Sequence, residues 1–199
     1  RHAARFPIVD PTDPTAAEIT PEGAATAEAL GRRLSGYDRL RLFHSPVKRC
    51  RQTAECLAQG ARQAGLVVEQ VTPEATLGVD YILDLKEAGR LTVLYGDHFV
   101  RRWMEGLIPE SVIRPTRAIM EEKLDYLLRK LAEPAAAGRR LDLHISHDWN
   151  VMVLRELLLG LRHEAAGWLT FLDGLVFTQC GSQLEVVYHD HRRTQRHPV

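Results

Sequence analysis

The chain has 199 residues, of which 45% are hydrophobic and 26% charged, a composition typical of a globular protein that buries a sizeable core. Its 26 lysines and arginines balance its 26 aspartates and glutamates, so no overall basic charge points to nucleic acid or to an anionic membrane. No apolar run approaches the ~20 residues that span a bilayer. Any site for an anion must therefore be local.

The cysteines and the first residues bear on the compartment. Cys50, Cys56 and Cys180 have neither the spacing of a disulfide framework nor that of a zinc site, so we expect them to be reduced. We expect a cytoplasmic protein, unless a leader has been removed. A motif that begins at residue 1 with no strand before it indicates a chain trimmed or processed at its N-terminus.

Helical and strand-like patterns alternate along the chain. The predicted helices are 21–36, 47–64, 117–131 and 147–160, and the predicted strands are 39–43, 66–71, 141–146, 175–180 and 183–188. The stretch 80–107 cannot be divided into elements from its pattern. Such alternation predicts an α/β fold, a three-layer sandwich in which helices flank a mostly parallel central sheet, and the length favours a single domain over 1–199.

The sequence contains three polar clusters. One lies at the start of the chain, and each of the other two follows a predicted strand. They are Arg1, His2 and Arg5, the segment 45–49 with Ser45 and Arg49, and the pair His147 and Asp148. In an open α/β sheet the carboxyl ends of neighbouring strands share one crevice, where ligands usually bind. We therefore expect a site with three guanidiniums, two imidazoles and one carboxylate, groups that suit a tetrahedral dianion such as phosphate.

Each residue taken alone has an ordinary structural explanation. A lone arginine is usually a surface residue, and His147 alone could be a hydrogen-bonded histidine at a strand end. Ser45 with Pro46 could simply begin a helix, as could Asp148. The recurrence of such residues at successive strand ends favours a common site.

Three ordered segments resemble one known family. "RHAARFP" (1–7) resembles the R-H-G-x-R-x-P signature of the histidine phosphatase superfamily, in its acid phosphatase branch, with Ala3 in place of the usual glycine. "HSPVKRCRQTAE" (44–55) is similar to the S-P-x-x-R-x-x-Q-T-A segment of the phosphoglycerate mutase-like branch, and "ISHDWNV" (145–151) to the acid phosphatases' H-D-x-N element. The resemblance runs from residue 1 to about 177, although no motif matches between 71 and 140.

The resemblance implies a phosphoglycerate mutase-like fold with a small cap insertion within 71–140. It implies a metal-independent phosphatase without a cofactor, acting on a phosphorylated small molecule or a phosphoprotein. His2 would form a phosphohistidine intermediate, which splits one difficult displacement into two easier ones. The residues implied to hold the phosphate are Arg1, Arg5, Arg49 and His147.

The proton donor is the point at which the branches differ. The acid phosphatase branch places its general acid at Asp148, whereas the mutase-like branch uses a glutamate, for which Glu74 and Glu87 are the substitutes in this chain. The alternatives are therefore a mutase-like enzyme, a phosphohistidine protein phosphatase, or an inactive module that only binds phosphate. Ala3 puts the geometry of the nucleophile loop in doubt. If the family's strand before this motif is absent, His2 lies on a loose terminus.

Two other features favour ordinary explanations. "HDHRR" (189–193) is interpreted as a polar tail rather than a metal site, because neighbours in an extended segment face opposite ways. Trp103, Trp149 and Trp168 are interpreted as core or pocket-wall residues.

Overall fold

The computed structural model describes residues 1–9, 14–134 and 137–196. Its helices are α1 (Pro21–Arg32), α2 (Lys48–Gln63), the 3₁₀ turn η1 (Ala75–Leu77), α3 (Leu85–Tyr95), α4 (His98–Met104), α5 (Thr116–Ala132), α6 (Asp148–Leu159) and α7 (His163–Ala166). Its strands are β1 (Arg39–His44), β2 (Val67–Pro73), β3 (Arg140–Ile145), β4 (Val176–Cys180), β5 (Gln183–Tyr188) and β6 (His191–Arg196).

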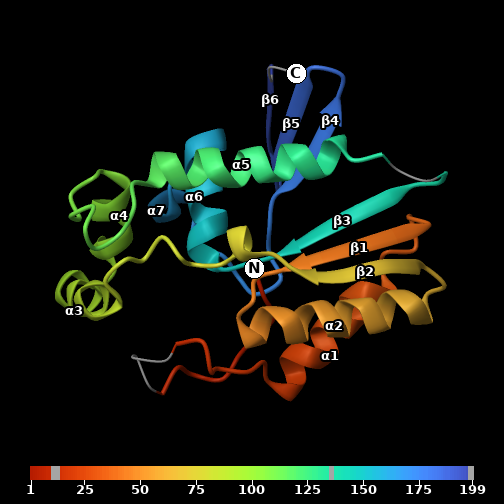
Figure 1. Cartoon of the computed structure of the whole chain (residues 1–199), viewed down its shortest axis with the longest axis horizontal. Coiled ribbons are helices and arrows are strands. Elements are labelled where there is room, and N and C mark those ends of the chain that lie inside the picture. Colours follow the sequence, from red (N-terminus) through yellow and green to blue (C-terminus); the bar gives the residue numbers. More distant parts are fainter. Residues whose placement is uncertain (10–13, 135–136, 197–199) are drawn as a thin grey trace.

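A parallel sheet of three strands lies between layers of helices (Figure 1). Its strand order is β2-β1-β3, and β1 pairs in parallel with both neighbours. The helices α1 and α2 cover one face, and α5 lies on the other side of the sheet. The prediction of an α/β fold with helices flanking a parallel sheet is therefore confirmed.

Close packing of the first two helices depends on glycine. A Cβ atom on Gly31 would lie 2.3 Å from the carbonyl oxygen of Leu57, and one on Gly60 would lie 1.9 Å from that of Glu28. The helix α1 starts as predicted, because the hydroxyl of Thr20 accepts from the backbone N–H of Gly23 at 3.0 Å. It ends at Arg32, one turn earlier than predicted.

The last three strands form a separate antiparallel sheet with the order β4-β5-β6. The predicted hairpin of β4 and β5 is confirmed. The interpretation of 189–193 as a polar tail was wrong, because β6 pairs with β5 along its whole length. The six residues of β6 are all polar, so no alternation of apolar side chains marks this strand in the sequence.

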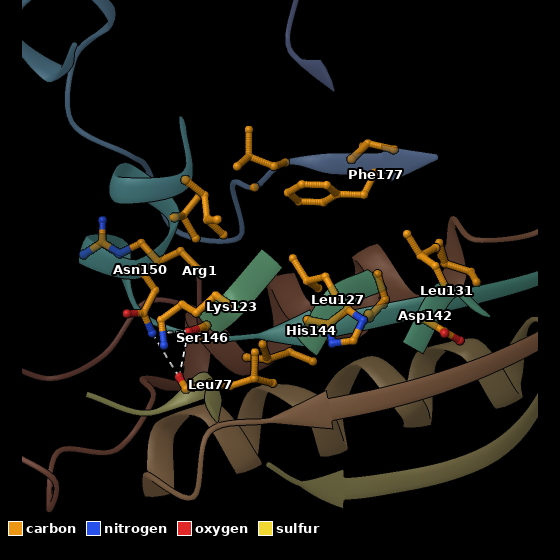
Figure 2. Close-up of a pocket in the computed structure, with 18 of the residues that line it drawn as sticks. Arg1, Leu77, Lys123, Leu127, Leu131, Asp142, His144, Ser146, Asn150 and Phe177 are labelled. Carbon is orange, nitrogen blue, oxygen red and sulfur yellow. Dashed lines mark hydrogen bonds between the residues drawn. The ribbon is translucent and has the colours of Figure 1, made fainter. Parts of the chain in front are cut away.

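A cavity of about 600 Å³ lies between β3 and the segment that contains β4 (Figure 2). One edge of β3 pairs with β1, and residues along β3 line the cavity together with apolar side chains such as Leu127, Leu131 and Phe177. Arg1 lies at one end. Neither His2 nor His147 lines this cavity, so it is not the site that the motifs predict.

The stretch that could not be divided forms α3 and α4, which lie to one side of the sheet (Figure 1). Aromatic rings join this region to α6, since Trp149 stacks on Phe99 with ring centroids 5.4 Å apart and lies 5.5 Å from Trp103. Trp103 and Trp149 therefore belong to the core, as predicted. Within the described residues, no helix has the length and apolar character needed to cross a membrane.

Candidate active site

The strand ends bring the three polar clusters together. Ser45 follows β1 directly, and His147 and Asp148 follow β3 after one further residue. The chain start lies beside them, because the backbone N–H of His2 donates to the carbonyl oxygen of Ser146 at 3.0 Å. The predicted convergence at the carboxyl ends of β1 and β3 is therefore what the structure shows for these residues.

Arg49 bridges the two histidines. Its Nε donates to Nε2 of His2 at 3.1 Å, and its Nη2 lies 3.1 Å from Nδ1 of His147. A third bond runs from Nη1 to the carbonyl oxygen of Pro14 at 2.7 Å. The three side chains Arg49, His2 and His147 are buried, so their relative positions are fixed by packing as well as by hydrogen bonds.

His2 has one unprotonated ring nitrogen, which accepts the bond from Arg49. Its Nδ1 lies 2.8 Å from the carbonyl oxygen of Ala3, which can only accept, so Nδ1 carries the proton and Nε2 does not. Burial, together with the nearby charges of Arg49 and Arg1, lowers the pKa of His2 to about 3, although the hydrogen bond to Ala3 acts in the opposite direction. The imidazole is therefore neutral at ordinary pH, with Nε2 directed at the guanidinium of Arg49.

His147 is the second neutral imidazole of the site. Burial, followed by the charge of Arg49, holds its pKa well below the ordinary value for histidine. Its Nε2 lies 2.9 Å from the hydroxyl oxygen of Ser45. Both ring nitrogens of His147 therefore have partners from the segment 45–49.

Arg1 and Asp148 form an ion pair beside the histidines. Arg1 Nη2 lies 3.1 Å from Asp148 Oδ2, and the guanidinium lies over the ring of Phe171 at 4.2 Å. Asp148 is the first residue of α6, whose N-cap position is His147, so it does not cap the helix in the usual manner. Its Oδ1 accepts from the N–H of Trp149 at 3.0 Å, whereas Oδ2 also accepts from Trp168 at 3.3 Å.

Arg5 is less closely engaged than the other arginines. It donates to the carbonyl oxygen of Phe6 at 2.9 Å and makes no described hydrogen bond with either imidazole. Its charge nevertheless reaches the site, because it contributes, after burial, to the lowered pKa values of Arg1 and Arg49. Arg5 therefore lies at the periphery of the predicted set.

The two glutamates considered as alternative proton donors are paired with cations. Glu74 lies 3.3 Å from Lys130, and Glu87 lies 2.7 Å from Arg90. Neither carboxylate has a described bond with His2 or His147. Among the carboxylates considered from the sequence, Asp148 is the one that the structure brings to the predicted site.

A side chain of α2 holds the loop that carries His2. The N–H of Ala3 donates to the hydroxyl of Thr53 at 3.0 Å, and that hydroxyl donates to the carbonyl oxygen of Arg49 at 2.7 Å. The described non-glycine residues with positive φ are Leu172 and His189, so Ala3 lies in a backbone conformation open to any residue. The doubt raised by the missing glycine is thereby removed.

A buried arginine ties α6 to the loop at 167–173. Arg155 donates to the hydroxyl of Tyr188 at 3.1 Å and to the carbonyl oxygen of Gly167 at 2.8 Å. The hydroxyl of Tyr188 in turn donates to the carboxylate of Asp173 at 2.8 Å. The same loop accepts the bond from the backbone nitrogen of Arg1 and donates to the carbonyl oxygen of His2.

Three residues at the site were not predicted as functional: Thr53, Trp168 and Phe171. Thr53 lies within a motif segment, so its hydroxyl could have been considered for a loop contact. Trp168 and Phe171 lie on a loop without a motif, and are 45% and 41% exposed. Only the three-dimensional structure places them beside Asp148 and His2.

One other group of side chains has the residue types of a metal site. Glu156, His163 and Glu164 could together offer three ligand atoms. Arg101, however, pairs with both carboxylates at 2.6 Å, so a guanidinium already binds the oxygens that a metal would need. It lies outside the residues predicted for the phosphate site.

With this geometry described, the sequence and the fold can be compared with known proteins. A family model, the histidine phosphatase superfamily (branch 1), matches residues 11–81. The resemblance to the histidine phosphatases is confirmed over this segment, which contains the second motif, at 44–55. No curated protein matches the sequence. The matched model is that of branch 1, whereas the first and third motifs of this histidine phosphatase-like chain resemble the acid phosphatases.

Solved structures confirm the phosphoglycerate mutase-like fold. A mycobacterial glucosyl-3-phosphoglycerate phosphatase superposes with a TM-score of 0.58 at 17% identity, over 98% of this chain and 93% of that chain. A protein described as mycobacterial hydrolase 2 gives 0.59 at 17% identity, over 98% of this chain and 86% of its own. At these identities the likeness establishes that the chain has the histidine phosphatase fold.

Proposed function

We propose that the protein is a phosphomonoester hydrolase that passes the phosphoryl group through Nε2 of His2. The observation that carries this proposal is the position of Arg49, which donates to His2 Nε2 and to His147 Nδ1, both at 3.1 Å. A guanidinium between an unprotonated imidazole nitrogen and a second imidazole suits a phosphate oxygen held next to a nucleophile. The histidine phosphatase resemblance supports phosphatase activity.

The reaction has two displacements. In the first, the lone pair of His2 Nε2 attacks phosphorus in line, the N–P bond forms, and the ester P–O bond breaks with its electron pair leaving on the oxygen. Asp148, protonated at this stage, gives its proton to that oxygen. In the second, Asp148 takes a proton from water, whose oxygen attacks phosphorus and breaks the N–P bond. Inorganic phosphate leaves and His2 is restored.

The charged residues would hold the non-bridging oxygens. Arg1 and Arg49 flank His2, and Arg5 adds charge from the periphery. His147 would join them once its Nδ1 carries a proton. Fixed donors of this kind stabilise the charge of the transition state, and loss of one typically costs ~3 to 4 kcal/mol.

The acid role of Asp148 belongs to the acid phosphatase-like form of this proposal. Its support is position, since Asp148 Oδ2 pairs with Arg1 at 3.1 Å and α6 begins at this residue. When Arg1 turns to a phosphate oxygen, the carboxyl group becomes free to meet the leaving group. The segment 74–115, with α3 and α4, is proposed as the small cap.

The proposed substrates are phosphorylated small molecules, with phosphoproteins as the second class. The structural neighbour named above is described as a glucosyl-3-phosphoglycerate phosphatase, and it has also been solved with inorganic phosphate and with VO3. A cytoplasmic location remains a prediction.

Turnover of p-nitrophenyl phosphate by wild type, His2→Ala and a matched control, His98→Ala, tests the proposal. His98 is exposed on α4. We expect steady phosphate release by wild type and His98→Ala, and loss of at least about 1,000-fold in His2→Ala. A rapid quench should trap acid-labile phosphate on the wild-type protein. Turnover retained in His2→Ala contradicts the mechanism, phosphate binding without turnover supports the binding module, and exchange without net release supports a mutase.

A further inference from the structure

We propose that Ser45 is a positioning residue that keeps the Nε2 proton of His147 turned away from His2 and leaves Nδ1 facing the phosphate site. The proposal rests on the proposed function, in which His147 holds a phosphate oxygen. It assigns to Ser45 a role through His147, without contact between Ser45 and the substrate.

The argument begins with what each atom can donate. The Nη2 of Arg49, 3.1 Å from His147 Nδ1, carries only protons and has no lone pair to offer. Nδ1 must therefore accept, and a neutral imidazole that accepts at Nδ1 carries its proton on Nε2. That proton points at the hydroxyl oxygen of Ser45, 2.9 Å away.

Packing and a backbone hydrogen bond fix the position of the Ser45 oxygen that accepts this proton. The side chain is fully buried at the end of β1, and its oxygen accepts from the N–H of Val47 at 3.3 Å. The thiol of Cys50, whose sulfur lies 3.8 Å from His147 Nε2, stays protonated because burial raises its pKa to about 12. The thiol also lies 3.8 Å from the carbonyl oxygen of Ser146, which can accept its proton.

A single placement of the protons then satisfies all the hydrogen bonds of this network. One branch leads from Arg49 through His147 to Ser45, and the other leads from Arg49 through His2 to the carbonyl oxygen of Ala3. Reversing the tautomer of His147 would point its N–H at the guanidinium, which offers no acceptor. Buried groups left unpaired in this way are costly.

The fixed tautomer determines which nitrogen can serve the reaction. When a phosphate dianion lies beside His147, a further proton can go only to Nδ1, because Nε2 already holds one. The resulting imidazolium donates from Nδ1 to a phosphate oxygen while Nε2 stays bonded to Ser45. Without Ser45 only the bond from Arg49 favours the proton on Nε2. The tautomer with its proton on Nδ1 then becomes more populated, and that proton disturbs the guanidinium that orients His2.

Long-range proton–nitrogen NMR of the ¹⁵N-labelled protein reads the tautomer directly. The His147 signals are identified by their absence in His147→Gln. We expect one protonated nitrogen, Nε2, and one unprotonated nitrogen, Nδ1, in wild type. In Ser45→Ala we expect the two nitrogen shifts to move toward each other as both tautomers become populated.

Two further variants isolate the hydroxyl. Ser45→Thr retains an acceptor and should keep the wild-type pattern, and Cys50→Ala removes the other group near Nε2, whose sulfur lies 3.8 Å away. We expect Cys50→Ala to keep the pattern too. With p-nitrophenyl phosphate we expect Ser45→Ala to lower kcat by about 10- to 100-fold with little change in KM, since misplacement of a catalytic group acts on the transition state.

The outcomes separate this proposal from the proposed function. An unchanged His147 pattern in Ser45→Ala, or a pattern lost equally in Cys50→Ala, overturns the role of Ser45 whatever the activity. A changed pattern with unchanged kcat also overturns it as a positioning role. If the wild type hydrolyses no phosphomonoester, the proposed function fails, while the NMR comparison still decides whether Ser45 fixes the tautomer.

Discussion

The Nε of Arg49 donates to Nε2 of His2 across 3.1 Å, and the same guanidinium reaches the second histidine from another of its nitrogens. A planar fork can make both bonds at once because its donors are held in a fixed geometry. A single ammonium on a flexible stem cannot reproduce this arrangement. The two imidazoles are therefore related through one rigid cation.

The first prediction concerns this fork. Arg49→Lys keeps the positive charge but loses the paired geometry, so we expect kcat/KM for p-nitrophenyl phosphate to fall by about 100-fold or more. Arg51→Lys on the exposed side of α2 is the matched control and should be unaffected. Equal activity of Arg49→Lys and wild type would show that charge alone suffices.

The second prediction is a pH–rate profile. The pKa of His2 is about 3, so its Nε2 remains unprotonated far below the pKa of an ordinary histidine. We expect kcat/KM to be retained as the pH falls from 7 to about 4.5. A fall in kcat/KM with its midpoint near pH 6.5 would contradict a buried neutral His2.

The third prediction links the same histidine to stability. Between the folded pKa of about 3 and the unfolded value near 6.5, the unfolded chain binds a proton that folded His2 does not. The free energy of unfolding should therefore be highest above pH 6.5 and fall below it, by up to ~1.4 kcal/mol per pH unit for this residue. Urea unfolding at pH 7.5 and 5 should show a smaller difference for His2→Asn than for wild type, and an unaltered difference for His98→Asn. A difference that His2→Asn leaves intact would assign the effect to other groups.

The fourth prediction tests Asp148 through the leaving group. An alkoxide needs a proton when it departs, whereas p-nitrophenolate is stable without one. We expect Asp148→Asn to slow hydrolysis of an alkyl phosphate such as glycerol phosphate by about 100- to 10,000-fold, and that of p-nitrophenyl phosphate much less. Equal losses on both substrates would mean that Asp148 acts in binding, and no loss on either would return the acid role to another group.

The fifth prediction concerns the support of the nucleophile loop. A Cβ on Gly23 would lie 2.3 Å from the carbonyl oxygen of Ala4, backbone that cannot move without shifting His2. We expect Gly23→Ala to lower the free energy of unfolding by about 1 to 3 kcal/mol. Gly36→Ala is the control, because no atom lies within 4 Å of its added Cβ. Similar stability of both variants would show that the loop adapts.

The sequence allowed the parallel sheet and its helices to be predicted because their signals are local. The apolar periodicity of α5 and the Thr20 cap of α1 are visible within a few residues. The strand β6 carries no such signal, since its stability comes from pairing with β5. The same holds for α4, whose Phe99 and Trp103 contact Trp149 of α6.

The candidate site divides in the same way. His2, Arg49, His147 and Asp148 stand in motifs at strand ends, so topology alone predicts that they meet. The order of the hydrogen bonds among them could not be predicted, because it depends on which atom of Arg49 faces which ring. Trp168 and Phe171 come to the site on a loop whose path is set by contacts with distant residues.

Arg155 shows that the spacing of the reacting groups is a property of the scaffold. It is fully buried in α6, seven residues after Asp148, and through Tyr188 and Gly167 it grips the loop that bonds to the backbone of Arg1 and His2. The distance between Asp148, the proposed proton donor, and His2, the proposed nucleophile, is thus supported by contacts of a residue that takes no part in the proposed reaction. Substitutions of the side chains proposed to hold the phosphate can therefore change its affinity without changing the distance between Asp148 and His2.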